Sequence, residues 1–182
     1  MMTTATVTLR ERLKTETLDL HQAVERRSPL VALFRGQPWA DDHGVAYRKS
    51  LSLQLDLIDA LARHKEDWEQ NVPSLSAVLQ TRQALVRDLL QDDVEESTAF
   101  ECSAAESIGL GYVMLGSSMG SQVILDKIGS GIPENQRHFL VAMAEASRAF
   151  FKFCEEVKAY ETQADDVVRG ARKAFEHLMI DR

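Results

Sequence analysis

The chain has 182 residues, of which 45% are hydrophobic and 27% charged, and its formal net charge is −7. These values suit one globular domain with a sizeable core, and they argue against a sequence-wide attraction to nucleic acid or to an anionic membrane. We find no apolar run expected to span a bilayer, and residues 1–10 lack the apolar core of a signal peptide. We therefore expect a cytoplasmic protein; its two isolated cysteines, Cys102 and Cys154, suit a reduced compartment, although a disulfide stays open.

Helix-period patterns fill most of the chain, and no convincing strand alternation is present. We predict an all-α fold in a single domain over residues 1–182, with residues 1–7 flexible. The first helix is predicted from roughly Thr8 to Arg27, where Ser28-Pro29 ends it. A short turn then extends to Gly36.

Five further helices and a loop follow in the predicted order. Asp41-Asp42 can cap a second long helix, and Ser74–Ser76 can start a third. The acidic stretch 92–96 predicts a solvated loop before a fourth, glycine-rich helix over roughly Ser103–Ile128. Pro133 suits the first turn of a fifth helix, which carries Phe139, Met143, Phe150 and Val157. A last helix is predicted from its apolar positions, which are Val167, Val168, Ala171, Phe175 and Leu178.

The fourth predicted helix carries Gly109, Gly116 and Gly120 within one narrow stripe. Each glycine inside a helix costs about 0.8–1 kcal/mol relative to alanine, so close approach to the bare backbone should compensate. Tight packing against another helix would explain the stripe, and so would a flat ligand lying on it. Glycine pairs also permit a kink, which would bend this helix over a ligand.

The first predicted helix presents Arg10, Lys14, Thr17 and His21 on one face. A histidine on such a face needs a hydrogen-bond partner or a metal. Glu25 lies one turn beyond His21 and could accept a hydrogen bond from one imidazole nitrogen, leaving the other for iron. The alternative is a structural histidine with a carboxylate neighbour.

The two segments resemble the haem-contacting helices of the haem oxygenase family. Leu13-Lys-Thr-Glu-Thr-Leu-Asp-Leu-His21-Gln-Ala-Val-Glu25 is similar to the proximal helix, and Tyr112-Val-Met-Leu-Gly-Ser-Ser-Met-Gly-Ser-Gln-Val-Ile124 to the distal helix. A weaker similarity spans Leu9 to Leu178 and includes Ala171-Arg-Lys-Ala-Phe175. The closest resemblance is to the bacterial, biliverdin-producing members that accompany phytochromes.

The resemblance implies a multi-helix bundle in which haem b is both substrate and cofactor. Haem would be opened at a meso carbon by O2 to biliverdin, iron and carbon monoxide. Electrons would come from a ferredoxin or an NAD(P)H-dependent reductase, and a phytochrome would accept the product. His21 would ligate the iron, and Gly116, Ser117 and Gly120 would form the catalytic face. The remaining haem-binding residues that the resemblance implies are Lys14, Arg10, Thr17, Glu25, Tyr112, Arg148, Lys152 and Phe175.

Several positions depart from the family pattern. Ser117 stands where many mammalian-type members have an aspartate, Leu115 replaces a common glutamate, and Ser121 replaces a frequent second glycine. These departures keep two alternatives open: a haem carrier or sensor without turnover, and a helical interaction protein without haem. The other histidines, at positions 43, 64, 138 and 177, are expected to be surface or structural residues.

Overall fold

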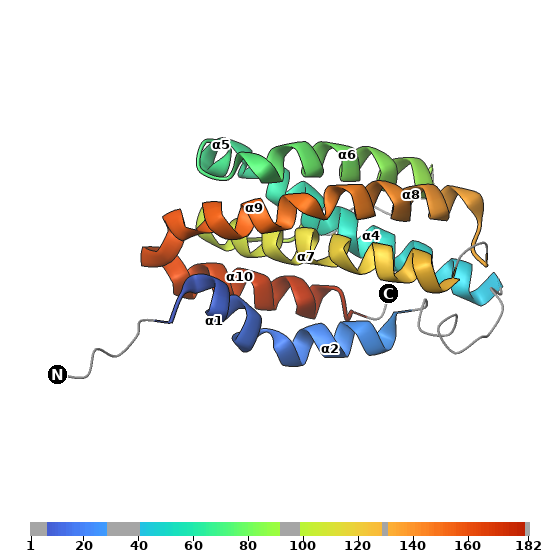
Figure 1. The fold of residues 1–182 in the computed structure, drawn as a ribbon, viewed down its shortest axis with the longest axis horizontal. Coiled ribbons are helices and arrows are strands. Elements are labelled where there is room, and N and C mark those ends of the chain that lie inside the picture. The colour runs from blue at the N-terminus through green and yellow to red at the C-terminus, as the bar shows by residue number, and fades with distance from the viewer. Residues whose placement is uncertain (1–6, 29–40, 92–98, 129–130, 181–182) are drawn as a thin grey trace.

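The computed structural model describes residues 7–28, 41–91, 99–128 and 131–180. Every regular element in these ranges is a helix, which confirms the all-α class predicted from the sequence (Figure 1). The residues 1–6, the predicted turn up to Gly36 and the predicted acidic loop over 92–96 lie outside the described residues.

The helices follow one another along the chain and pack into one bundle (Figure 1). Their bounds are α1 (Leu9–Glu16), α2 (Leu18–Arg27), α4 (Asp41–Arg63), α5 (Lys65–Trp68), α6 (Pro73–Leu90), α7 (Ala104–Ile128), α8 (Glu134–Ala146), α9 (Arg148–Glu156), the 3-10 helix η1 (Val157–Gln163) and α10 (Ala164–His177). The helix α7 runs through the middle of the bundle and packs against α10, α8 and α4, while α2 lies along α10. The glycine-rich helix is therefore central.

Two helices that the sequence predicts as continuous are each divided in two. The first breaks at Thr17, whose φ of −118° and ψ of 1° separate α1 from α2, and whose buried hydroxyl donates to the Leu13 carbonyl at 2.6 Å. The fifth breaks at Ser147, whose hydroxyl donates to the Ala144 carbonyl at 2.6 Å. Hydroxyls that bond back to a preceding carbonyl commonly bend helices, and hydrophobic periodicity does not register such a bend.

The contact between α7 and α10 depends on two glycines that face each other's helix. A Cβ at Gly109 would lie 2.1 Å from the Val167 carbonyl oxygen, and a Cβ at Gly170 would lie 2.0 Å from the Glu106 carbonyl oxygen. Both distances are far below any allowed contact, so the two backbones touch only because neither residue has a side chain. This part of the glycine stripe is therefore explained by helix packing.

The helix α7 is also long and apolar enough, over Ala104–Lys127, to cross a membrane. This differs from the sequence-based expectation that no such run exists. Half of this apolar segment is buried inside the protein, and the core helix of a helical bundle can be equally long and apolar. The length and composition of α7 are therefore only weak evidence for a membrane span.

Candidate functional site

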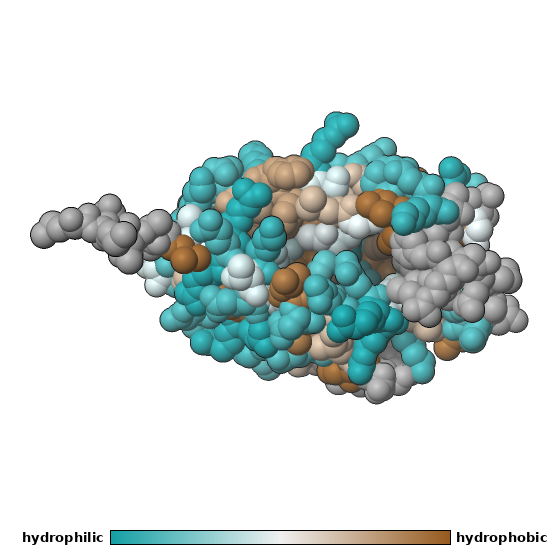
Figure 2. Space-filling view, turned by 60° about the horizontal axis from the view of Figure 1, so that its bottom comes forward, coloured by the Kyte–Doolittle hydropathy of each residue, from teal (hydrophilic) through white to brown (hydrophobic). Residues whose placement is uncertain are grey.

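A cavity of about 850 Å³ opens between α2, α4, α7 and α10. Its volume lies within the range of roughly 300–1,000 Å³ that is typical of small-molecule and cofactor sites. Figure 2 shows apolar and pale residues gathered around a hollow on the side that carries α1 and α2, with hydrophilic residues around them. Of the residues singled out from the sequence, those that line the cavity are His21, Glu25, Tyr112, Gly116, Ser117, Gly120 and Phe175.

The imidazole of His21 lies on the α2 wall of the cavity and is about half exposed. Its Nε2 is 3.6 Å from a Glu25 carboxylate oxygen, which is an ion-pair distance but longer than a hydrogen bond. The Phe175 ring meets the imidazole edge-on, with 5.7 Å between the ring centroids. These two neighbours limit how the imidazole can turn, while Nδ1 carries no hydrogen bond among the described residues.

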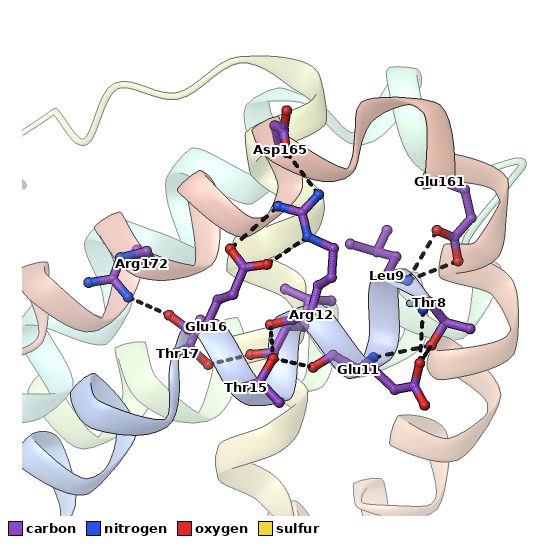
Figure 3. A network of polar contacts seen from close by, with 11 residues as sticks. Thr8, Leu9, Glu11, Arg12, Thr15, Glu16, Thr17, Glu161, Asp165 and Arg172 are labelled. Atoms are coloured by element: carbon purple, nitrogen blue, oxygen red, sulfur yellow. Dashed lines mark hydrogen bonds and ion pairs between the residues drawn. The ribbon is translucent and has the colours of Figure 1, made fainter. Parts of the chain in front are cut away.

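A network of polar contacts fixes the helix that precedes this imidazole (Figure 3). Arg12 pairs with Glu16 at 2.6 Å and with Asp165 at 2.8 Å, and the Leu9 amide donates to Glu161 at 3.0 Å. Exposed ion pairs contribute little free energy, so the stability of α1 comes from burial of Leu9 and Leu13. The network joins α1 to η1 through Glu161 and to α10 through Asp165.

The α7 wall is bare where Gly116 and Gly120 face the cavity. A Cβ at Gly116 would meet only the Phe150 ring, at 3.7 Å, and a Cβ at Gly120 would meet nothing within 4 Å. The glycine stripe therefore has two parts: Gly109 packs against α10, whereas Gly116 and Gly120 leave open space. Helix packing explains the stripe at Gly109, and the space beside Gly116 and Gly120 leaves the prediction of a flat ligand there untested.

Two aromatic rings continue this wall. Tyr112 is partly buried, lines the cavity and meets the Phe150 ring at 5.7 Å between centroids. Tyr112 is therefore a residue of the cavity wall. Burial raises the pKa of its phenol, with the Cys154 thiol adding to the shift, so the hydroxyl stays protonated at neutral pH.

Five of the residues implied by the resemblance do not line the cavity. Thr17 is buried at the bend between α1 and α2, and this bend also leaves Arg10 and Lys14 exposed on α1. Lys152 is largely exposed and pairs with Glu156 at 3.7 Å.

The fifth, Arg148, lines a separate pocket of about 700 Å³ between α7 and α8. The prediction that Arg10 and Lys14 share a face with His21 assumed that the first helix is straight. The break at Thr17 removes that assumption.

Sequence reasoning missed the basic residues that do line the cavity. Arg27 and Lys49 lie on its α2 and α4 walls, and the Arg27 guanidinium donates to the Met179 carbonyl at 2.6 Å. Arg82 lies on the α6 wall and is only 3% exposed. A signal for Arg82 was present, because it occupies a position on the same helical face as Val78 and Val86, which are both buried.

The guanidinium of Arg82 is held by neutral groups. Its Nη2 donates to Gln54 at 2.7 Å and to Ser117 at 2.9 Å, and its Nη1 donates to the Met114 carbonyl at 2.5 Å and to Ser118 at 3.2 Å. Its Nε has no hydrogen-bond partner among the described residues. Burial, only partly opposed by the neighbouring Tyr47, lowers the pKa of Arg82 to about 10, so it remains a cation at neutral pH.

The other described histidines lie outside the cavity lining. His64 contacts Asp67 at 3.1 Å and the Cys102 carbonyl at 2.9 Å, and His177 contacts the buried Asp56 at 2.8 Å. No group of three or more histidine, cysteine, aspartate or glutamate side chains gathers in the part of the chain that the structure describes. A free metal ion needs several protein ligands, whereas haem needs only an axial one, since its ring supplies the rest.

Comparison of the chain with family models, with curated proteins and with solved structures finds no match. The two motifs and the cavity that their residues share are the features that point to a function.

Proposed function

We propose that the protein is a haem oxygenase that converts haem to biliverdin, iron and carbon monoxide. One observation carries the proposal: His21 of α2 and the bare backbone at Gly116 and Gly120 of α7 line the same cavity. These residues come from two motifs that lie about ninety positions apart, each of which resembles a haem-contacting helix of the family. A chance arrangement would have no reason to bring them to one space.

The residues around the cavity fit a flat, largely apolar ligand with a charged edge. The imidazole of His21 is accessible, and a Cβ at Gly120 would project into open space. Aromatic rings suit the faces and edges of a porphyrin. Arg27 and Lys49, which line the cavity, can pair with its carboxylates.

Bound haem would supply the iron at which O2 is reduced, with electrons from a ferredoxin or an NAD(P)H-dependent reductase. The side chains of this protein would hold and orient the haem. His21 would ligate the metal, and Glu25 and Phe175 would orient its imidazole. Arg27 and Lys49 would hold its carboxylates and so orient the haem within the cavity.

Ser117 lies where a proton could be delivered. Its hydroxyl donates to the Met114 carbonyl at 2.8 Å and accepts from Arg82 at 2.9 Å, so one lone pair remains for a water molecule. A water anchored there can relay protons without a carboxylate at this position. Gly116 and Gly120 keep the space beside it clear.

The experiment is aerobic reduction of the hemin-loaded protein, followed by chromatography of the pigment. We expect loss of the Soret band and formation of a biliverdin, and we expect His21→Ala to abolish both. His138→Ala is the matched control, because His138 is exposed and lies outside the cavity lining. A Soret band that persists through reduction would instead indicate a haem carrier or sensor. Absence of saturable hemin binding would indicate a helical interaction protein without haem.

A further inference from the structure

Arg82 combines three properties that structural arginines seldom share. It is 3% exposed, it lines the cavity, and no carboxylate of the described residues pairs with it. Burying a charge is costly unless an opposite charge compensates it. The four hydrogen bonds to Gln54, Ser117, Ser118 and the Met114 carbonyl satisfy the terminal nitrogens but carry no negative charge.

The aromatic neighbour of Arg82 does not replace a counter-ion. The guanidinium carbon lies 5.9 Å from the centre of the Phe139 ring, at the outer limit of a cation–π contact. The Nε–H donor remains without an acceptor among the described residues. Arg82 lines the cavity, and its buried charge has no counter-ion among the described residues, which indicates that a negatively charged group belongs beside it.

We propose that Arg82 is the anion-binding residue of the cavity, which pairs with a small inorganic anion that enters beside Ser117. In the haem-loaded protein, a form that depends on the proposed function, Arg82 stabilises anions that ligate the iron. His21 and Arg82 reach the same cavity from α2 and α6, so an anion bound to a haem held by His21 shares the cavity with the guanidinium. Arg82 then selects the charge of the incoming ligand.

The test compares an anionic iron ligand with a neutral one. Hemin-loaded protein is titrated with sodium azide and, separately, with imidazole, and each Kd is read from the spectrum. Arg82→Met is expected to raise the azide Kd about tenfold, since a charge-assisted hydrogen bond is lost. The imidazole Kd should change less than about twofold, whereas a mere structural disturbance would move both constants. Arg82→Lys should recover part of the azide affinity.

A second variant cancels the charge without removing the arginine. Gln54 accepts from Arg82 at 2.7 Å, so Gln54→Glu places a carboxylate of the same size at hydrogen-bond distance. This variant should weaken azide as Arg82→Met does, and it keeps the test valid if Arg82→Met does not fold. An unchanged ratio of azide to imidazole affinity in the folded Gln54→Glu protein overturns the proposal.

An experiment without haem separates this proposal from the proposed function. In the 15N-labelled, haem-free protein, the Nε–Hε cross-peak of Arg82, assigned with Arg82→Lys, is followed during titration with sodium azide at constant ionic strength. We expect a saturable shift that Gln54→Glu abolishes. Failure of hemin to bind would refute the haem oxygenase proposal alone, whereas a cross-peak that azide does not move would refute the role of Arg82.

Discussion

Alanine substitution of two glycines on the same helix should have opposite effects on stability. Both Gly109 and Gly120 lie within α7, so replacing either with alanine gains about 1 kcal/mol of intrinsic helix propensity. At Gly120 nothing lies within 4 Å of the new Cβ, and the whole gain should appear as added stability. At Gly109 the new Cβ would lie 2.1 Å from the Val167 carbonyl oxygen and 2.4 Å from the Ala171 nitrogen.

The clash at Gly109 involves backbone atoms of α10, which cannot rotate away. The two helices must separate, at a cost of about 3 kcal/mol or more. The two variants should therefore differ by about 3 kcal/mol or more in their free energy of unfolding, because the propensity gain is common to both and cancels. Urea unfolding followed by far-UV circular dichroism measures this difference, provided that the transitions are two-state with similar slopes.

A third substitution connects the open space with binding. Gly120→Leu should leave the fold intact but raise the hemin Kd at least tenfold, because its side chain projects into the cavity. Destabilisation by Gly120→Ala would refute the reasoning, since it would mean that another group fills the space. Normal hemin affinity in Gly120→Leu would mean that the ligand lies elsewhere.

Three further predictions concern charged groups. Burial alone would raise the pKa of Glu106, but hydrogen bonds from Lys173, the Ser103 amide and Arg169 outweigh it and lower that pKa from 4.5 to about 2. Because the folded-state pKa is depressed, this stabilisation is present above pH 4.5 and is lost as pH falls toward 2; urea unfolding should show Glu106→Gln less stable than wild type at neutral pH, with the gap closing over that window. In Soret titrations, Lys49→Ala should raise the hemin Kd about threefold and Lys14→Ala less than twofold, because only Lys49 lines the cavity. His177→Leu should cost about 3 kcal/mol in urea unfolding, since it removes a 2.8 Å contact to a carboxylate that is 1% exposed; a cost under about 1 kcal/mol would contradict that role.

The all-α class followed from the sequence because apolar spacing is a local property of each helix. Apolar spacing does not predict the breaks at Thr17 and Ser147, where a hydroxyl that bonds to a nearby carbonyl bends the chain without changing the periodicity. Of the two bends, the one at Thr17 matters more for the candidate site. It placed Lys14 away from the cavity, although a straight helix would have aligned it with His21.

Part of the candidate site was predictable because it lies within short motifs. His21 and Glu25 are one turn apart on α2, and Gly116 and Gly120 are one turn apart on α7. That they share a cavity depends on tertiary packing, which spacing along the chain does not contain. Arg82 was missed for the same reason, since its contacts with α4 and α7 join positions more than twenty-five residues apart.

Haem ligation by His21 is the claim on which the functional account depends most directly. It is tested by titrating hemin into His21→Gly protein and recording the spectrum before and after addition of free imidazole. The account predicts a lost histidine-ligated spectrum that imidazole restores, because the ligand can occupy the space left by the side chain. A spectrum identical to that of the unmodified protein before any imidazole is added would contradict it.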